Sequence, residues 1–337
     1  MKKSPSLLLF TSILMMSTMI SLTANTWLGV WMGMEINLMS FIPMISCQST
    51  PNMKMSSIKY FIVQAVASVT LIMSFTLLSM NMYYTNNMII CMIMTASIMM
   101  KMGAAPLHFW FPEVMDQMNW TNCMILMTWQ KIAPMVAIYY LQPNNLMMSI
   151  FIITSAIVGA IMGMNQISLK LIMAYSSINH IGWLLASIYY NMITFMWYIL
   201  IYITLTIMIC LMLKSGNINS INEMFMNMNQ DKINKLNMTI TMLSLGGMPP
   251  LIGFLPKWIL IQEMMIKSSF LIVTVLIISS TISLYYYMKM FLSAGLMSMK
   301  ENKWNLNDIK KSKIQTIMMY INMMSTLGLT ISPIIIF

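Results

Sequence analysis

The chain has 337 residues, of which 59% are hydrophobic and only 8% are charged, and its formal net charge is +10. This composition is that of an integral membrane protein and argues against a soluble fold. We also expect no separate soluble domain, because no polar stretch is long enough to bury a core of its own. All the basic residues are lysines. The bidentate arginine clamp for phosphate is therefore missing, which argues against a nucleotide- or nucleic-acid-binding protein.

Apolar windows of about 20 residues, the length that crosses a hydrocarbon core about 30 Å thick, recur along the chain. We predict an all-α, polytopic membrane protein of about eleven transmembrane helices, forming a single membrane domain over residues 1–337. The predicted spans are 6–22, 26–46, 58–80, 88–115, 122–141, 147–164, 168–189, 192–213, 237–266, 269–293 and 315–335. Their connections are short and polar, except for the asparagine-rich 214–236 and the lysine-rich 294–314.

Lys2 and Lys3 precede the first predicted span and could mark a secretory signal, but we expect a retained span because no small-x-small cleavage site follows. With eleven spans, the N-terminus and the even-numbered connections lie on one face of the membrane. Most lysines of the connections are on that face, and Lys267 is the only lysine on the opposite face. The positive-inside rule makes the lysine-rich face cytoplasmic, or its mitochondrial equivalent, the matrix. The lysines on this face are Lys2, Lys3, Lys54, Lys59, Lys170, Lys214, Lys232, Lys235, Lys300, Lys303, Lys310, Lys311 and Lys313.

The second predicted span carries an acidic residue, Glu35. At 1.5 Å per residue, it lies about 13 Å into the span, near the middle of the bilayer. Gly29 and Gly33 in this span, and Gly159 and Gly163 in the sixth, form small-xxx-small pairs. We interpret these pairs as positions of close helix packing.

Two predicted spans contain the same interruption. The first break, residues 103–112, and the second break, residues 247–256, share Gly, Pro, Leu and Pro at identical spacing, at an offset of 247 − 103 = 144 residues. Proline removes a helix hydrogen bond and glycine loosens the backbone, so each segment predicts a membrane helix broken partway. Because the copies lie five spans apart, they cross the membrane in opposite senses. We predict an inverted five-helix repeat over 6–141 and 147–293, with 315–335 appended, and a transport pathway at the paired breaks.

Three lysines join Glu35 in the apolar spans: Lys101 before the first break, Lys131 in the fifth span, and Lys257 after the second break. Each would cost at least about 2.5 to 3.5 kcal/mol if it faced lipid, so we expect these residues to turn toward one another or toward water. Burial disfavours the charged form of both residue types and a neighbouring opposite charge favours it, so a buried Glu–Lys pair can switch. We predict that Glu35 pairs with Lys101 and that Lys131 and Lys257 continue a proton relay. The alternative is a set of ion pairs that only fix helix register.

Two histidines are further candidates. His180 falls 180 − 35 = 145 residues after Glu35, close to its repeat-equivalent position, and serine hydroxyls flank it. Both a relay role and a hydrogen-bonded structural role stay open for it. His108, inside the first break, could carry a proton or only satisfy freed carbonyls. Glu113 and Asp116 lie near the lysine-rich face, and we expect both to be surface carboxylates.

The sequence offers no pattern for a bound cofactor. Its four cysteines, Cys47, Cys91, Cys123 and Cys210, show neither metal-binding spacing nor a disulfide framework. The 49 methionines stand mostly where leucine would, which favours apolar filling over copper(I) binding. Without an HExxH, GxGxxG, P-loop or Cys-x-x-Cys motif, we expect no metal, nucleotide or redox centre in this chain.

Five segments, 27–38, 101–112, 128–134, 174–183 and 246–258, resemble the NADH:ubiquinone oxidoreductase chain 2 family. Its members are the mitochondrially encoded, antiporter-like membrane subunits of respiratory complex I. The resemblance extends over most of the chain, although the last seventy or so residues carry little of it. One departure is visible: where the family commonly has two basic residues before a Met-Ala-Tyr-Ser-Ser stretch, this chain has Lys170 followed by Leu171.

The resemblance implies a subunit that contributes to proton translocation across the mitochondrial inner membrane, and an enzyme only as part of that translocase. It places Glu35, Lys101, Lys131 and Lys257 on the proton-translocation axis, with His180 between them. The N-terminus is expected in the matrix and the C-terminus in the intermembrane space. Expected partners are the lipid bilayer and other membrane-arm subunits, without nucleic acid or a soluble small-molecule substrate. NADH, flavin, iron–sulfur clusters and ubiquinone are expected in other subunits. The alternatives are a self-standing cation/proton antiporter and a purely structural membrane subunit.

Overall fold

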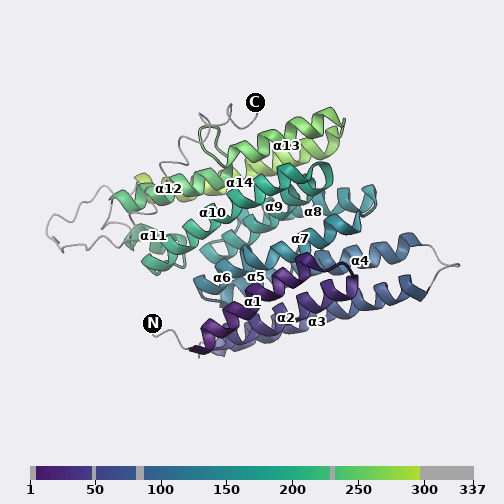
Figure 1. The fold of residues 1–337 in the computed structure, drawn as a ribbon. Coiled ribbons are helices and arrows are strands. Elements are labelled where there is room, and N and C mark those ends of the chain that lie inside the picture. Colours follow the sequence, from purple (N-terminus) through teal and green to yellow (C-terminus); the bar gives the residue numbers. More distant parts are fainter. Residues whose placement is uncertain (1–4, 48–50, 81–86, 228–231, 297–337) are drawn as a thin grey trace. The chain divides into compact units, whose positions relative to one another are not determined.

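The computed structural model describes residues 5–47, 51–80, 87–227 and 232–296, and Figure 1 shows that this part of the chain is built from helices. The predicted all-α class is confirmed. In chain order the helices are α1 (Pro5–Thr23), α2 (Trp27–Ser46), α3 (Pro51–Met80), α4 (Asn87–Met102), α5 (Trp110–Gln117), α6 (Trp120–Met127), α7 (Trp129–Leu141), α8 (Asn145–Met164), α9 (Leu169–Tyr190), α10 (Met192–Gly216), α11 (Ile221–Asn227), α12 (Lys232–Gly246), α13 (Phe254–Ile266) and α14 (Phe270–Leu296).

Seven helices of the described part are long and apolar enough to cross a membrane, as expected of a multi-pass membrane protein. Most predicted spans between 6 and 293 match helices or helix pairs within a few residues. Helix α3 is longer than predicted and begins at Pro51, because proline suits the first turn of a helix, where its missing N–H has no partner to lose. The predicted span 315–335 lies outside the described residues, so the number of spans stays a prediction.

The chain divides into two compact units, Met1–Ser155 and Ala156–Phe337. Helix α8 begins in the first unit and ends in the second. The single membrane domain and the inverted repeat over 6–141 and 147–293 stay predictions.

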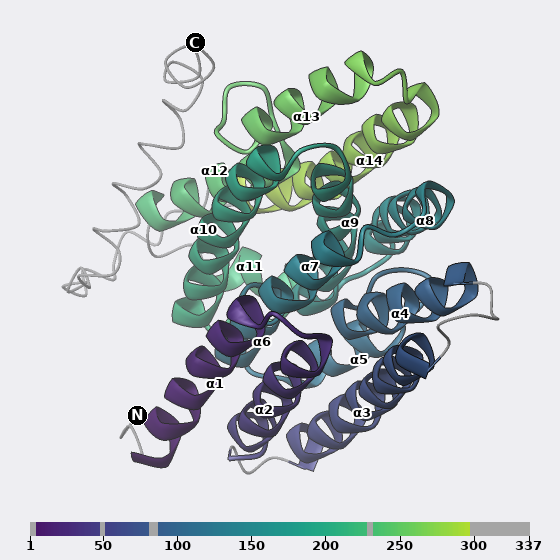
Figure 2. The ribbon, with the colours of Figure 1, turned by 45° about the vertical axis from the view of Figure 1, so that its right-hand side comes forward.

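In the first unit, α1 packs on α2, α2 on α3, and α3 on α4, and Figure 2 shows the first three side by side. Glycines allow α1 and α2 to come close. A Cβ atom on Gly33 would lie 2.8 Å from the backbone nitrogen of Ser21, and one on Gly29 would lie 2.9 Å from the Cβ of Ala24. The interpretation of this glycine pair as a packing contact is confirmed.

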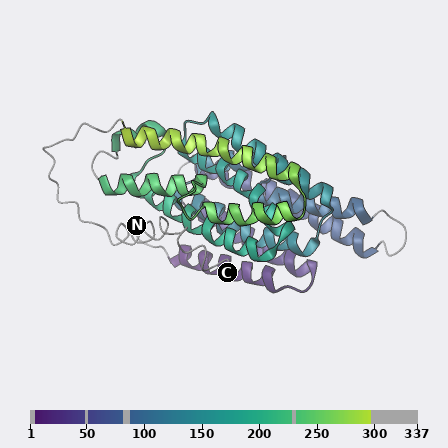
Figure 3. The ribbon, with the colours of Figure 1, turned by 90° about the horizontal axis from the view of Figure 1, so that it is seen from above.

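In the second unit, α9 forms the centre, and nearly all of its residues are buried. Helices α10, α13 and α14 pack against it, and α14 also runs alongside α12 (Figure 3). Gly159 of α8 lets the backbones meet, because a Cβ atom there would lie 2.5 Å from the backbone nitrogen of Asn179. Asn191 alone joins α9 to α10, and its side chain caps α10 by accepting a hydrogen bond from the Ile193 N–H.

The first break begins with a glycine cap on α4. Gly103 adopts φ +73°, a left-handed conformation that favours glycine. The Ala104 N–H donates to the Met99 carbonyl at 3.0 Å, and the Gly103 N–H donates to the Met100 carbonyl at 3.2 Å. This bonding pattern is the Schellman motif, which ends a helix while satisfying its last carbonyls. The Trp110 indole, at the start of α5, also donates to the Met100 carbonyl, at 3.0 Å.

The second break repeats this cap at the same offset. Gly247 has φ +84°. The Met248 N–H donates to the Leu243 carbonyl at 3.2 Å, and the Gly247 N–H donates to the Ser244 carbonyl at 3.1 Å. Farther along, a Cβ atom on Gly253 would overlap the Ser244 carbonyl oxygen, so the chain returns against the helix end it has just left. The prediction of two similarly broken helices is confirmed.

A further interruption was not predicted. The expected span 122–141 is divided at Thr128, which has φ −107° and ψ −71° and separates α6 from α7. The Thr128 hydroxyl donates to the Met124 carbonyl at 2.7 Å, a side-chain bond of the kind that bends helices. Pro134 follows inside α7 and has no N–H to donate to the Gln130 carbonyl.

The asparagine-rich connection 214–236 carries structure of its own, including α11. The Leu169 N–H donates to the Asn219 carbonyl at 2.9 Å, and the Ile221 N–H donates to the Ile167 carbonyl at 3.2 Å. The Asn219 N–H also donates to the Glu223 carboxylate at 2.7 Å, which lowers the pKa of Glu223 below its ordinary value. The connection is thereby tied to the start of α9.

Candidate functional site

Glu35 and Lys101 form a buried ion pair in the first unit. The Lys101 Nζ lies 3.7 Å from the Glu35 Oε1, and the two side chains are 3% and 22% exposed, respectively. Within the described residues, neither atom has a hydrogen-bond partner. The predicted pairing of these residues is therefore confirmed, at a separation slightly longer than a hydrogen bond.

The first break places Lys101 in this position. Lys101 is in the last turn of α4, at the negative end of the helix dipole. Its own carbonyl accepts a hydrogen bond from the Gln64 amide of α3 at 3.2 Å. The backbone of Lys101 thus belongs to a helix end that both the Gly103 cap and a side chain from α3 stabilise.

Lys131 lies three residues after the interruption at Thr128 and is 2% exposed. Its Nζ is 5.6 Å from the centroid of the Phe111 ring, within the range of a cation–π contact. Phe111 lies in the first break, where α5 begins. The break therefore contributes to the surroundings of both Lys101 and Lys131.

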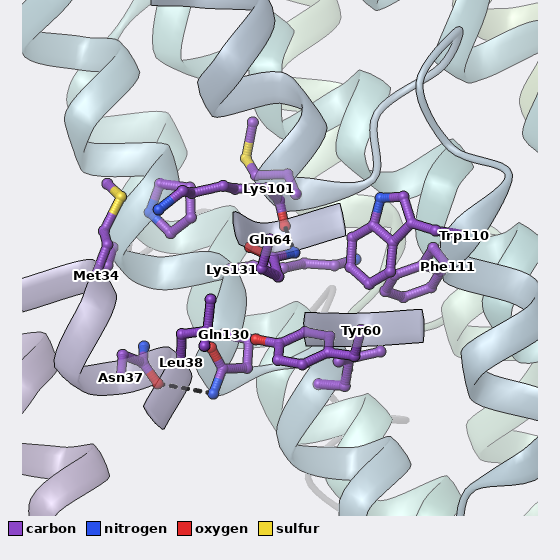
Figure 4. Close-up of a pocket in the computed structure, with 14 residues that line it drawn as sticks. Met34, Asn37, Leu38, Tyr60, Gln64, Lys101, Trp110, Phe111, Gln130 and Lys131 are labelled. Atoms are coloured by element: carbon purple, nitrogen blue, oxygen red, sulfur yellow. Dashed lines mark hydrogen bonds between the residues drawn. The ribbon is translucent and has the colours of Figure 1, made fainter. Parts of the chain in front are cut away.

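A cavity of about 30 Å³ has both Lys101 and Lys131 in its lining. A water molecule needs roughly 10–15 Å³ on this measure, so the cavity can hold about two. Figure 4 shows the Gln130 amide pointing toward Asn37, to which it donates a hydrogen bond at 2.9 Å. The other polar side chains of the lining are Tyr60 and Gln64.

Sequence reasoning missed these four polar neutral residues. Asn37 and Gln130 could have been recognised by their positions, because Asn37 follows Glu35 by two residues and Gln130 directly precedes Lys131. Tyr60 and Gln64 had a weaker signal, their spacing of four residues on a single face of α3.

Lys257 occupies the first turn of α13 in the second unit and is 5% exposed. Its Nζ donates a hydrogen bond to the Gly246 carbonyl at 3.0 Å, and lies 5.6 Å from the centroid of the Trp183 ring. The lysine therefore links the two helices that flank the second break. Within the described residues it has no carboxylate in ion-pair range.

His180 is 6% exposed and lies on α9. Its Nδ1 is 2.9 Å from the Tyr198 hydroxyl, and its ring centroid is 5.1 Å from that of Tyr202. Beside these rings is a cavity of about 10 Å³, which the second break also lines through Gly253 and Pro256. Its volume is near the lower limit for one water molecule.

The remaining candidates occupy less central positions. His108 is buried in the first break, and its Nδ1 lies 3.3 Å from the Pro106 carbonyl, which fits the satisfaction of a freed carbonyl. Glu113 and Asp116 are exposed, as expected, and Glu113 pairs with Lys59 at 2.7 Å. The described ranges contain no cluster of three or more His, Cys, Asp or Glu side chains suited to a metal ion.

The structure therefore groups the predicted residues by unit: Glu35, Lys101 and Lys131 in the first, His180 and Lys257 in the second. The continuation of a relay from Lys131 to His180 stays a prediction. What each group offers chemically is a set of buried side chains that can hold or release a proton.

Comparisons with known proteins identify the family. Residues 24–283 match the family described as NADH:quinone oxidoreductase/Mrp antiporter, transmembrane. NADH-ubiquinone oxidoreductase chain 2 of Locusta migratoria is 44% identical, over 96% of this chain and 94% of that protein. The chain belongs to the NADH-ubiquinone oxidoreductase chain 2 family. Another member, from Anopheles gambiae, is 38% identical over 97% of both chains.

Solved structures share the fold of this chain. A chain of respiratory complex I from Thermus thermophilus, with bound aureothin, superposes with a TM-score of 0.86 at 18% identity, covering 99% of this chain and 81% of that one. A chain of the Mrp complex from Dietzia sp. has a TM-score of 0.76 at 12% identity, covering 96% and 75%. At these identities the likeness concerns the fold.

Proposed function

We propose that this chain is a core membrane subunit of respiratory complex I that contributes to proton translocation across the mitochondrial inner membrane through a buried Glu/Lys/His relay. Membership of the chain 2 family supports its place in the complex. The observation that carries the relay is the buried Glu35–Lys101 pair beside a polar cavity that Lys131 also lines.

In the first unit, one proton moves between two lysines. The Glu35 carboxylate stabilises the Lys101 ammonium at 3.7 Å. When the Glu35 carboxylate turns away, that attraction is lost and Lys101 releases a proton to water in the cavity. A neutral Lys131 takes up a proton from the same water, so Lys101 becomes neutral, Lys131 becomes charged, and the total charge is conserved.

The polar lining makes such a transfer possible. Proton hopping through water requires hydrogen-bonding partners that hold each molecule in place, and a buried water typically makes about three hydrogen bonds. The amides of Asn37 and Gln130 and the hydroxyl of Tyr60 are groups of this kind. Phe111 faces the Lys131 ammonium and stabilises its charged form through the ring.

In the second unit, His180 and Lys257 hold the proton in turn. His180 can take up a proton on a ring nitrogen and release it again. Lys257 is poised between the helices of the second break, with the Gly246 carbonyl as a hydrogen-bond acceptor for its ammonium form. The relay in the proposal runs from Glu35 and Lys101 through Lys131 and His180 to Lys257.

The proposed setting follows from charge placement and family. The gathering of lysines on one predicted face supports a matrix N-terminus and an intermembrane-space C-terminus. The partners are other membrane-arm subunits, and NADH, flavin, iron–sulfur clusters and ubiquinone are bound by other subunits.

Purification tests the antiporter alternative, because a subunit of the complex is recovered in fixed ratio with redox partners, whereas a self-standing antiporter is recovered alone.

Replacing Lys131 with methionine tests the relay within the assembled complex. Methionine keeps the length and apolar stem of lysine but holds no proton, so proton uptake per NADH oxidised should fall several-fold. Lys54→Met is the matched control, because Lys54 is exposed near the start of α3. Unchanged uptake in the Lys131 variant would leave the chain with a purely structural role.

A further inference from the structure

The hydroxyl of Tyr198 is placed against the proton-exchanging ring of His180. The hairpin of α9 and α10 brings this about, because the single residue Asn191 connects the two helices and turns α10 back along α9. Tyr198 and Tyr202 are four residues apart and therefore share one face of α10. Both rings contact His180, with centroid separations of 6.1 Å and 5.1 Å.

The hydroxyls of these two tyrosines differ in their partners. The Tyr198 hydroxyl lies 2.9 Å from the His180 Nδ1. The Tyr202 hydroxyl interacts with the side chain of Ser177 on α9. The two tyrosines are alike in residue type, helix and burial, since they are 2% and 3% exposed, but one of them has its hydroxyl hydrogen-bonded to the imidazole.

A phenol hydroxyl suits a ring that gains and loses a proton, because its oxygen accepts a hydrogen bond from a ring N–H in either charge state. When His180 is neutral, its Nδ1–H donates to the Tyr198 oxygen, and the basic lone pair is on Nε2. When Nε2 takes up a proton, the same Nδ1–H still donates to the Tyr198 oxygen. The hydrogen bond persists in both states without a change of rotamer, so the proton is gained and lost at Nε2.

We propose that Tyr198 is a positioning residue for the relay: its hydroxyl holds the His180 ring and directs proton exchange to Nε2. This inference rests on the proposed function, in which His180 carries the proton between Lys131 and Lys257. It assigns a specific task to a residue that no motif in the sequence singled out.

The surroundings of His180 contain few other groups that can change charge. In the described part of the chain, α10 contributes Tyr198, Tyr202 and Cys210, and α14 contributes Tyr287. Cys210 and Tyr287 both interact electrostatically with Tyr202. Helix α13 contributes Lys257, which faces Trp183, the residue one turn after His180 on α9. Removing the Tyr198 hydroxyl therefore alters the partner of His180 Nδ1 and leaves these other groups in place.

The test compares Tyr198→Phe with Tyr202→Phe in the assembled complex, in membrane vesicles. Each substitution removes one buried hydroxyl and keeps the ring, so a purely structural effect should be similar in both. We expect about tenfold slower proton uptake at a given rate of NADH oxidation in Tyr198→Phe, equivalent to about 1.4 kcal/mol. Proton uptake by the Tyr202→Phe complex should stay within about twofold of that of the unaltered complex, a difference of less than about 0.5 kcal/mol.

A double substitution shows whether Tyr198 acts through His180. If it does, adding Tyr198→Phe to His180→Ala should cause no further loss, because the ring that the hydroxyl positions is already gone. The pH profile of uptake should also change in Tyr198→Phe and not in Tyr202→Phe. Tyr198→His, which retains a hydrogen-bonding group, should recover part of the lost uptake and provides the test if the phenylalanine variant does not assemble.

The outcomes separate the inference from the proposed function. Normal uptake in Tyr198→Phe together with impaired uptake in His180→Ala would overturn the inference and leave the relay intact. Equal losses in the two phenylalanine variants would also overturn it, because the hydroxyls would then matter only for packing. Normal uptake in His180→Ala would remove His180 from the relay, and the inference with it.

Discussion

Changing Glu35 to glutamine tests the buried ion pair with very little change in shape. At 3.7 Å, two unit charges attract by about 332/(20 × 3.7), or about 4.5 kcal/mol, at the effective dielectric constant of about 20 that suits protein sites. The Glu35 side chain is 22% exposed, so screening by solvent reduces the effective loss to roughly 2 to 4 kcal/mol. A loss of this size shifts the protonation equilibrium of Lys101 by at least about tenfold toward the neutral amine.

We expect the Glu35→Gln complex to assemble normally and oxidise NADH, with a several-fold lower proton uptake per NADH. The assay measures both rates in the same sealed vesicles with a pH-sensitive dye. Glu113→Gln is the matched control. Glu113 also pairs with a lysine, at 2.7 Å, but its side chain is 57% exposed, and exposed pairs contribute only about 0 to 1 kcal/mol.

Either of two results would contradict a role for the buried ion pair. If the Glu35→Gln complex pumps as the unaltered complex does, the Glu35–Lys101 pair has no bearing on proton movement. If Glu113→Gln lowers uptake equally, loss of an exposed carboxylate is enough to lower uptake, and the burial of the Glu35–Lys101 pair does not explain the effect.

Two further substitutions probe the cavity and the second break. Asn37→Leu removes the acceptor of the Gln130 amide and leaves that amide unsatisfied, which costs about 1 to 3 kcal/mol. Water should then bind less well in the cavity, and proton uptake per NADH should fall several-fold. Unchanged uptake would show that proton movement does not need this part of the lining. Gly253→Ala forces a Cβ atom onto the Ser244 carbonyl, so native gels should show much less assembled complex. Gly246→Ala, whose nearest atom would be 3.3 Å away on a side chain, should assemble better; equal yields would contradict the packing argument.

Sequence reasoning succeeded where the membrane leaves few physical options. A charged residue in an apolar span must find a partner or water, so the pairing of Glu35 with Lys101 could be predicted without knowing any packing. Glycine and proline act on the local backbone, so the repeated pattern at Gly103 and Gly247 predicted both breaks, and their caps share the two hydrogen bonds of the Schellman motif.

It was less successful with neutral polar residues. Asparagine, glutamine and tyrosine are tolerated in many membrane helices, so the residue type of Gln130 does not reveal its partner, although its place beside Lys131 indicates a position near the site. Its partner, Asn37, is 93 positions away, and that distance is closed only by the packing of helices. The interruption at Thr128 was missed because threonine is common in continuous helices.

The helical membrane class, the two breaks and the set of ionisable residues in the spans can be predicted from short segments, because hydrophobic length, backbone chemistry and the cost of burying charge are local properties. Which groups face one another depends on the packing of the helices, as in the cavity lined by Lys101 and Lys131 and in the contact of the Tyr198 hydroxyl with His180. These contacts depend on how side chains from separate helices interlock, and that geometry arises only when the whole bundle is packed.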